Sequence, residues 1–245
     1  MRIDKLLSNI GFGSRKEVKQ LLKTGAVKID GESVKDPKKH VDPYQQQVTV
    51  NDERVEYKEF VYLLMNKPAG YLSATEDEYQ ETVIDLLEME DAVFQPFPVG
   101  RLDKDTEGLL LLTNDGQLSH QLLSPKKHVP KTYYAVILGE VTNEDVIAFK
   151  NGVELDDGYV TKPAKLEIIS SGNQSNQSII HVTITEGKFH QVKRMFESVG
   201  KKVTYLKRVS MGPIELDEEE LKTGEYRELT EEEVEALRDA KPIEL

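Results

Sequence analysis

The chain has 245 residues, of which 38% are hydrophobic, and this is enough to bury the core of one large domain or of a small domain and a larger one. It contains no cysteine, which excludes disulfide bonds and thiolate metal sites and is typical of a reducing compartment such as the cytoplasm. The formal net charge of −12 is unevenly distributed, because residues 1–40 hold ten Lys and Arg against five Asp and Glu, whereas residues 215–245 hold four against thirteen.

The basic head of the chain is predicted to fold as two helices and a hairpin. Apolar residues at helical spacing predict a short helix over residues 3–10. A capping-box pattern that begins at Ser14 predicts a second helix, which ends before Gly25. The Asp-Gly pair at 30–31 lies between alternating apolar residues and therefore predicts a hairpin turn.

The cations of the second helix are expected to share its solvated side, because the apolar residues must face the core. Such a surface can be an ordinary solvated face or a phosphate-binding one. Residues 2–37, RIDKLLSNIGFGSRKEVKQLLKTGAVKIDGESVKDP, resemble the alpha-L RNA-binding domain. The resemblance implies contacts with RNA backbone, which position a protein without reading sequence directly. The candidate RNA-binding residues of the head are Arg2, Lys5, Ser14, Arg15, Lys16, Lys19 and Lys23.

A second hairpin around Asn51-Asp52 and a polar stretch follow, and we place the domain boundary after residue 59, which gives domains 1–59 and 60–245. Short, turn-linked segments beyond it predict an α+β domain with a mixed, mainly antiparallel sheet. Strands are expected at 61–65, 108–113, 132–138, 164–170, 178–185 and 203–210, and helices near 82–89, 116–124, 142–150 and 188–199. A polar loop is expected at 170–178, and a surface helix after Thr230.

The segment 100–116, GRLDKDTEGLLLLTNDG, places a charged turn just before an apolar strand that only burial explains. An isolated Arg-x-Asp would more simply be a salt bridge of the loop itself. Taken whole, the segment resembles the catalytic signature of the pseudouridine synthases, in the branch that acts on ribosomal RNA and includes ribosomal small-subunit pseudouridine synthase A. The resemblance covers essentially the entire chain, with further landmarks at 65–75, 131–137 and 186–214.

The resemblance assigns a role to each of a few residues. Asp103 corresponds to the catalytic aspartate, Tyr133 to the tyrosine that packs on the target base, and Lys193 to the basic partner. The wider superfamily often has arginine at the position of Lys193, so Arg194 remains an alternative partner. Arg101 either contacts a phosphate beside the target nucleotide or braces the turn.

The implied reaction breaks the N1–C1′ bond of a uridine, turns the uracil and rejoins it through C5. Because nothing is oxidised or hydrolysed, no cofactor is expected, and the five histidines show no paired spacing for a metal. The carboxylate of Asp103 attacks C1′ or C6, or removes the C2′ proton, and these routes stay open. The base must leave its stack to enter a pocket expected between Leu102, Leu109 and Tyr133, where stacking on the tyrosine is worth about 1–3 kcal/mol.

Two neighbouring residues suggest other chemistry. Asp105 would give the carboxylate pair of a glycoside hydrolase, but side chains two residues apart on one turn are expected to diverge. His190 is a general base, or else structural or phosphate-facing. We therefore expect a cytoplasmic, monomeric enzyme without a membrane segment that modifies ribosomal RNA, preferably 16S RNA, within an assembling subunit. The alternatives are a 23S RNA enzyme and a non-catalytic RNA-binding assembly factor.

Overall fold

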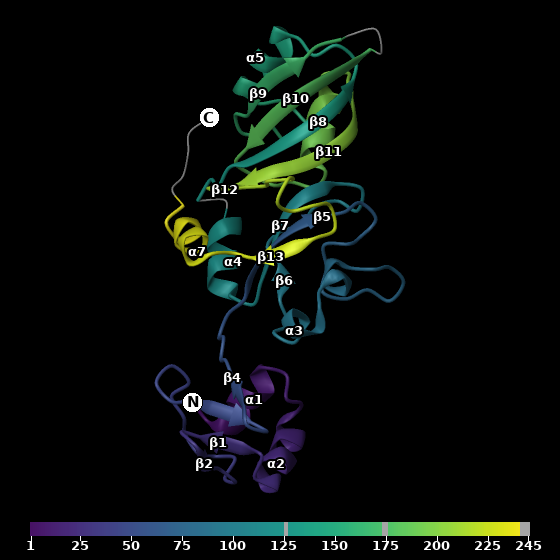
Figure 1. The fold of residues 1–245 in the computed structure, drawn as a ribbon. Coiled ribbons are helices and arrows are strands. Elements are labelled where there is room, and N and C mark those ends of the chain that lie inside the picture. The colour runs from purple at the N-terminus through teal and green to yellow at the C-terminus, as the bar shows by residue number, and fades with distance from the viewer. Residues whose placement is uncertain (125–126, 173–175, 241–245) are drawn as a thin grey trace. The chain divides into compact units, whose positions relative to one another are not determined.

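A computed structural model describes residues 1–124, 127–172 and 176–240, so the middle of the polar loop expected at 170–178 lies outside the described residues. Contacts divide the chain into two compact units (Figure 1). The first comprises Met1–Val61 and Leu87–Pro96, and the second comprises Tyr62–Leu86 and Phe97–Leu245. The segment Leu87–Pro96 thus packs with the first unit, although its place in the sequence lies within the expected second domain.

The first unit has the predicted helices and hairpins around one apolar core. The capping box is formed, since the Ser14 backbone N–H donates to Glu17 Oε2 at 2.7 Å and the Glu17 N–H donates to Ser14 Oγ. The second helix ends at Gly25, whose φ of +81° is left-handed. The elements are α1 (Ile3–Asn9), α2 (Arg15–Thr24), β1 (Val27–Ile29), β2 (Glu32–Ser33), β3 (Val48–Val50) and β4 (Glu53–Val55), in an antiparallel sheet of order β2-β1-β3-β4.

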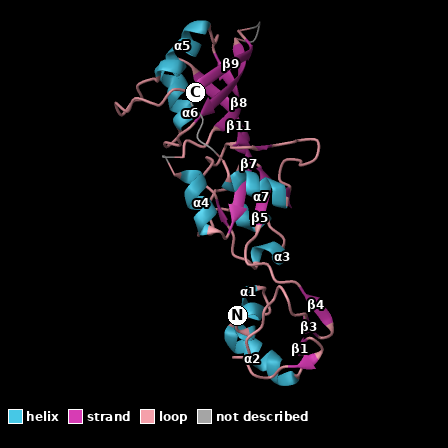
Figure 2. Ribbon diagram, turned by 90° about the vertical axis from the view of Figure 1, so that its left-hand side faces the viewer, coloured by secondary structure: helices cyan, strands magenta, loops and turns pink. Residues whose placement is uncertain are grey.

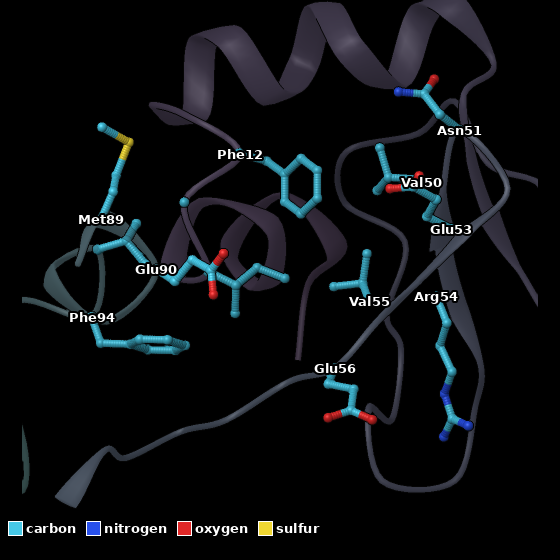
Figure 3. Close-up of a pocket in the computed structure, with 13 residues that line it drawn as sticks. Phe12, Val50, Asn51, Glu53, Arg54, Val55, Glu56, Met89, Glu90 and Phe94 are labelled. Carbon is cyan, nitrogen blue, oxygen red and sulfur yellow. The ribbon is translucent and has the colours of Figure 1, made fainter. Parts of the chain in front are cut away.

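The segment Leu87–Pro96 and the rest of the first unit together line a groove. The short helix α3 (Met89–Ala92) and the residues after it line this groove together with Phe12, Val55 and neighbouring residues (Figure 3). At Gly11, where φ is +90°, a Cβ atom would lie 2.3 Å from Val93 Cγ2, so only glycine allows this approach. The helix expected near 82–89 is instead a 3₁₀ turn, η1 (Val83–Leu86), in the second unit, followed by the separate α3.

The second unit is built on a nine-stranded sheet of order β13-β5-β7-β11-β8-β10-β9, with β6 on β7 and β12 on β11. Its strand pairs are antiparallel except β7 with β11, which confirms the predicted mixed, mainly antiparallel sheet. The strands are β5 (Tyr62–Lys67), β6 (Phe97–Pro98), β7 (Glu107–Thr113), β8 (Lys131–Leu138), β9 (Lys165–Ser170), β10 (Gln177–Ile184), β11 (Lys202–Met211), β12 (Ile214–Glu215) and β13 (Tyr226–Glu228).

Helices α4 (Gly116–Leu123), α5 (Asn143–Asn151), α6 (Gln191–Ser198) and α7 (Glu231–Arg238) complete the second unit. Helix α5 packs on β9 and α6 on β11, and Figure 2 shows both helices beside these strands. Helix α7 begins with the predicted capping box of Thr230 and Glu233 and packs against α4. None of the helices in the described part of the chain is both long and apolar enough to cross a membrane.

The uniform apolar run of β7 lies in the core, as predicted. Leu109, Leu110, Leu111 and Leu112 are all at most 3% exposed. The buried strand fixes the backbone of the charged turn that precedes it, and this turn carries Asp103.

Candidate active site

The turn before β7 is held from inside the protein by a buried lysine. Lys67, at the end of β5, is completely buried, and its ammonium group donates to the carbonyl oxygens of Pro68, Asp103, Lys104 and Thr106 at 2.9–3.3 Å. Burial lowers the pKa of Lys67 to about 8. Four backbone dipoles therefore converge on one cation, and the backbone of the turn is fixed around it.

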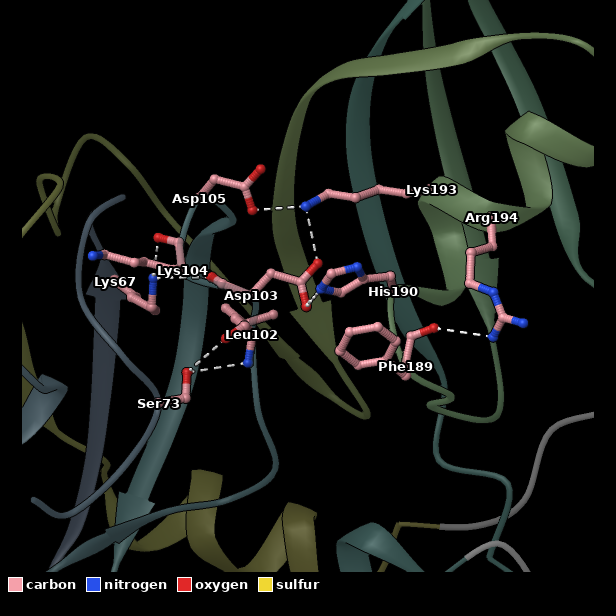
Figure 4. Close-up of polar contacts among 10 residues, drawn as sticks. All are labelled: Lys67, Ser73, Leu102, Asp103, Lys104, Asp105, Phe189, His190, Lys193 and Arg194. Carbon is pink, nitrogen blue, oxygen red and sulfur yellow. Dashed lines mark hydrogen bonds and ion pairs between the residues drawn. The ribbon is translucent and has the colours of Figure 1, made fainter. Parts of the chain in front are cut away.

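A serine fixes the same turn from a second side. Ser73 Oγ donates to the carbonyl oxygen of Leu102 at 3.0 Å and accepts from the N–H of Leu102 at 3.1 Å (Figure 4). The sequence landmark at 65–75 contains both Lys67 and Ser73, but nothing in its local pattern shows that they hold Asp103. With the backbone anchored on both sides, the carboxylate of Asp103 has a defined position.

The carboxylate of Asp103 lies against two basic side chains of the segment at the start of α6 (Figure 4). Asp103 Oδ2 lies 3.0 Å from Lys193 Nζ, and Asp103 Oδ1 lies 3.5 Å from His190 Nε2. The Asp103 side chain is 25% exposed and that of Lys193 is 21% exposed, so the pair is neither sealed in the core nor open to bulk solvent. Burial alone would lower the pKa of Lys193, but hydrogen bonds to Asp105 and Asp103 outweigh it and raise this pKa.

Asp105 converges on the same cation, and the expectation that the two carboxylates diverge is wrong. Lys193 Nζ donates to Asp105 Oδ1 at 2.7 Å while it pairs with Asp103. This hydrogen bond lowers the pKa of Asp105, so Asp105 is an anion at neutral pH. A glycoside hydrolase needs one carboxyl group that stays protonated, and Asp105 does not meet that need.

Arg194 does not contact Asp103. Its guanidinium pairs with Asp156 and with Asp157 at 2.7 Å, and Nη1 donates to the carbonyl oxygen of Phe189 at 3.4 Å. Consecutive residues of an α-helix point about 100° apart, so Lys193 and Arg194 cannot face the same carboxylate. Of the two candidate partners, the structure therefore brings Lys193 to Asp103 and directs Arg194 elsewhere (Figure 4).

A small pocket of about 80 Å³ opens beside Asp103. Arg101, Leu102 and Tyr133 are among its lining residues, whereas Leu109, which was also expected in the wall, is completely buried in the core. Tyr133 is 8% exposed and lies on β8 between Val182 of β10 and Arg208 of β11. The alternation of a strand sends the next residue, Tyr134, to the other face, where its ring packs edge-on against Tyr205 and His181.

His190, considered above as a general base or as a structural or phosphate-facing residue, stacks on Phe189, and the residue pattern did not reveal this stack. Their rings stack with centroids 3.7 Å apart, and His190 has a left-handed φ of +47° at the N-cap of α6. Phe189 is 67% exposed, so the stack presents an aromatic surface next to Asp103. The landmark at 186–214 includes both residues, and the aromatic Phe189 beside His190 is a signal that could have indicated the stack.

The candidate residues of the head lie on the first unit. Lys5, Arg15, Lys16, Lys19 and Lys23 are all exposed, and four of them are on α2. Ser14 is engaged in its capping box. Arg2 is engaged with the buried Asp4, at 2.6 Å. Contacts of these side chains with RNA stay predictions.

The described residues contain no group of three or more His, Asp and Glu side chains placed to hold a metal ion. The side chains that the site offers for chemistry are those of Asp103, Lys193 and Tyr133. A carboxylate paired with a cation beside an aromatic ring can act as a nucleophile or a base on a flat, extruded substrate.

Comparison with known proteins identifies the family. A model of RNA pseudouridylate synthases matches residues 61–198, and a model of the S4 domain, which is the alpha-L module expected for the head, matches residues 1–43. A crystal structure of a pseudouridylate synthase is similar over 97% of this chain and 99% of that one, with a TM-score of 0.67 and 36% identity.

Three relatives align over nearly their whole length. An uncharacterized RNA pseudouridine synthase, YtzG, of Bacillus subtilis (strain 168) is 60% identical over 98% of this chain and 99% of its own. Ribosomal small subunit pseudouridine synthase A of Yersinia pestis is 40% identical, covering 96% and 97%. Ribosomal large subunit pseudouridine synthase B of Bacillus subtilis is 39% identical, covering 97% and 95%. The chain therefore belongs to the RNA pseudouridylate synthases, with an S4 domain at its N-terminus.

Proposed function

We propose that this pseudouridine synthase isomerises a uridine of ribosomal RNA, preferably 16S RNA of the small subunit, through the carboxylate of Asp103. The observation that carries the proposal is the pair of Asp103 and Lys193, 3.0 Å apart, beside the pocket that Tyr133 lines. The pair supplies an anion that is held ready for reaction next to a surface on which a base can stack.

Each side chain has one task in the proposed reaction. The uridine leaves its stack and its uracil packs on Tyr133, because the enzyme cannot surround C1′, C5 and C6 of a stacked base. The carboxylate of Asp103 reacts at C1′, C6 or the C2′ proton, and Lys193 pairs with it from the start of α6. The N1–C1′ bond breaks, the C5–C1′ bond forms, the C5 proton leaves and N1 gains a proton, so the product is an isomer of the substrate.

The preference for 16S RNA rests on the head of the chain. The opening RIDKLLSNIGFGSRKEVK and the later DPKKHVDP resemble the small-subunit enzymes more than their large-subunit relatives. Relatives named for the small and the large subunit are 40% and 39% identical, so 23S RNA is the second candidate. We further propose that a monomer acts in the cytoplasm on an assembling subunit, because a large folded RNA is best approached by a single copy of the enzyme.

Release of tritium from [5-³H]uridine in unmodified 16S and 23S RNA tests the proposal. The wild type is expected to release tritium from 16S RNA, and Asp103→Asn is expected to release none while its affinity for RNA changes by less than about twofold, since only the charge is lost. Asp156→Asn is the matched control, because it removes an exposed carboxylate that pairs with Arg194 instead.

Three results would contradict parts of the proposal. Equal rates for wild type and Asp103→Asn would remove Asp103 from the chemistry. Release from 23S RNA alone would transfer the function to the large subunit. Release from neither RNA would point to another RNA as the substrate.

A further inference from the structure

A second, larger cavity adjoins the Asp103 pocket within the second unit. It has a volume of about 340 Å³ and shares Arg101, Tyr133 and Lys188 with that pocket. Lys131 and Arg208 lie in its wall as well, and these two are among the most deeply buried cations of the chain. The proposed reaction uses neither Lys131 nor Arg208.

Arg208, on β11, is a buried cation without a carboxylate partner among the described residues. It is 2% exposed, its Nε donates to the carbonyl oxygen of Leu109 at 2.8 Å, and its Nη2 has no hydrogen-bond partner. An arginine keeps its proton at any pH that proteins encounter, so this charge cannot be relieved by titration. Burying a charge without a partner lowers the stability of the fold, unless a bound group of opposite charge compensates it.

Lys131, at the start of β8, adds a second buried cation to the same cavity. It is 9% exposed, and its ammonium group donates to the carbonyl oxygen of Val129 at 3.1 Å but forms no ion pair with a described residue. Burial, and then the charge of Arg208, lower the pKa of Lys131 to about 8. An anion in the cavity would relieve both effects.

One carboxylate, that of Glu186, lies in the wall of the cavity, and no hydrogen bond or ion pair joins it to Arg208 or Lys131 among the described contacts. Glu186 is 8% exposed and accepts hydrogen bonds from the Tyr159 hydroxyl at 2.7 Å, the Lys162 backbone N–H at 3.0 Å and the Gln191 amide at 2.7 Å. Its oxygens are thus occupied by neutral donors. The cavity has an excess of positive charge, because one carboxylate lines it together with five cationic side chains, those of Arg101, Lys131, Lys162, Lys188 and Arg208.

We propose that this cavity binds a backbone phosphate of the RNA next to the extruded uridine, with Arg208 and Lys131 as its ligands. The proposal rests on the proposed function, because the RNA supplies the phosphate. A phosphate offers acceptors to the incompletely paired guanidinium of Arg208, which lines the cavity, and to the ammonium of Lys131, and charged hydrogen bonds of this kind are the strong ones. A neutral base would leave both charges uncompensated. Holding the neighbouring phosphate would fix the flipped nucleotide against Tyr133.

The variant Lys131→Met tests the proposal, because it removes the charge while it keeps most of the side-chain length. We expect it to bind unmodified rRNA about tenfold more weakly, which corresponds to the loss of one charged hydrogen bond. The slope of log affinity against log salt should fall by about 0.7. Its Tm should equal or exceed that of the wild type, because a buried charge is gone. Lys150→Met, at an exposed position on α5, is the matched control and should keep the wild-type slope.

Two additional measurements separate the possible ligands. Arg208→Lys keeps the charge but loses the planar pair of donors, so we expect a higher KM for RNA with a folded protein. Inorganic phosphate, added at constant ionic strength against chloride, should raise the Tm of the wild type and not that of Lys131→Met. Stabilisation by phosphate with an unchanged RNA slope would show a site for free anions and overturn the proposal.

Failure of this proposal can be told apart from failure of the proposed function. If Asp103→Asn is inactive while Lys131→Met matches Lys150→Met in slope and affinity, the cavity does not bind RNA and the reaction stands. If the wild type releases no tritium but Lys131→Met lowers the slope, the cavity binds RNA phosphate and the assigned substrate is wrong.

Discussion

Lys193 is shared between two carboxylates that differ in exposure. Asp103 is 25% exposed and lies in the pocket, whereas Asp105 is 74% exposed and lies outside it. When the Asp103 carboxylate turns toward a substrate, the hydrogen bond from Lys193 to Asp105 would still hold the ammonium in place. We therefore expect Asp105 to help position Lys193, although its place in the motif did not suggest this, because an Asp two residues away on a turn was expected to point elsewhere.

The titration of Lys67 predicts how the stability of the protein depends on pH. Its pKa is about 8 in the folded protein and near 10.5 in an unfolded chain, so its burial is unfavourable while it is charged. Below pH 8 both states hold the proton, and its effect on stability is constant. Between about pH 8 and 10.5, Lys67 is protonated in a larger fraction of unfolded than of folded molecules. The free energy of unfolding of the wild type therefore increases as the pH rises, by about 3 kcal/mol at most.

Urea unfolding of wild type and Lys67→Met at several pH values between 7 and 10 would measure this gain. The difference in free energy of unfolding, wild type minus variant, should be flat below pH 8 and then rise, because other groups titrate alike in both proteins. A difference that stays constant up to pH 10 would show that burial does not destabilise the ammonium of Lys67.

At the scale of elements, the parallel pair of β7 and β11, the one such pair among the described strands, depends on Gly108. This residue of β7 has a φ of +100° and lies opposite Arg208 of β11, and a Cβ atom on it would be 2.2 Å from the Arg208 carbonyl oxygen. We expect Gly108→Ala to lower the free energy of unfolding by about 3 kcal/mol, because backbone strain and a backbone clash add. Chemical denaturation measures this loss.

Gly224→Ala is the control for Gly108→Ala. Gly224 has a similar φ of +90°, but no atom lies within 4 Å of its added Cβ, so this variant carries the strain alone and should lose about 1 kcal/mol. Equal losses in the two variants would mean that the approach of β7 to β11 is not as close as described.

Elements were predictable where their pattern was long enough to show a period. Strands β8 and β10, each of eight residues, were located from sequence: β8 alternates in burial throughout, and β10 alternates up to Val182. The two-residue strands β6 and β12 are too short to show any period, and so is the four-residue helix α3, which ends up in the first unit. Their existence depends on the partners they pack against.

Residues of the candidate site could be predicted from the sequence only where they stand in a motif of the family. Asp103, Tyr133 and Lys193 each stood in a landmark with a counterpart in the family. The hydrogen bond from Lys67 to the carbonyl oxygen of Asp103 joins residues 36 positions apart, and that from Ser73 to Leu102 joins residues 29 apart. Such contacts exist only once the chain has folded, so no local pattern could reveal them.

At the scale of the whole molecule, the N-terminal region carries an excess of basic residues and the C-terminal region an excess of acidic ones. The acidic C-terminal region satisfies part of its charge internally, since Glu218 pairs with Lys207 at 2.6 Å and Glu233 with Arg227 at 2.7 Å. The basic side chains of α2 are exposed, and Arg15 and Lys16 form no ion pair with a described residue. Part of the acidic charge is thus paired within the protein, whereas Arg15 and Lys16 of α2 stay exposed, and we expect them to bind an anionic partner.

The division predicts that binding and catalysis can be separated by variants of the head. Arg15→Ala with Lys16→Ala should raise KM for rRNA and lower the slope of log affinity against log salt by about 0.7 to 0.9 for each lost phosphate contact. At saturating RNA, kcat should stay the same, because the residues around Asp103 belong to the second unit. Lys150→Ala with Lys202→Ala removes the same charge from exposed positions of the second unit and should keep the wild-type slope. If both double variants behave alike, the effect is one of net charge, and α2 does not contact the RNA.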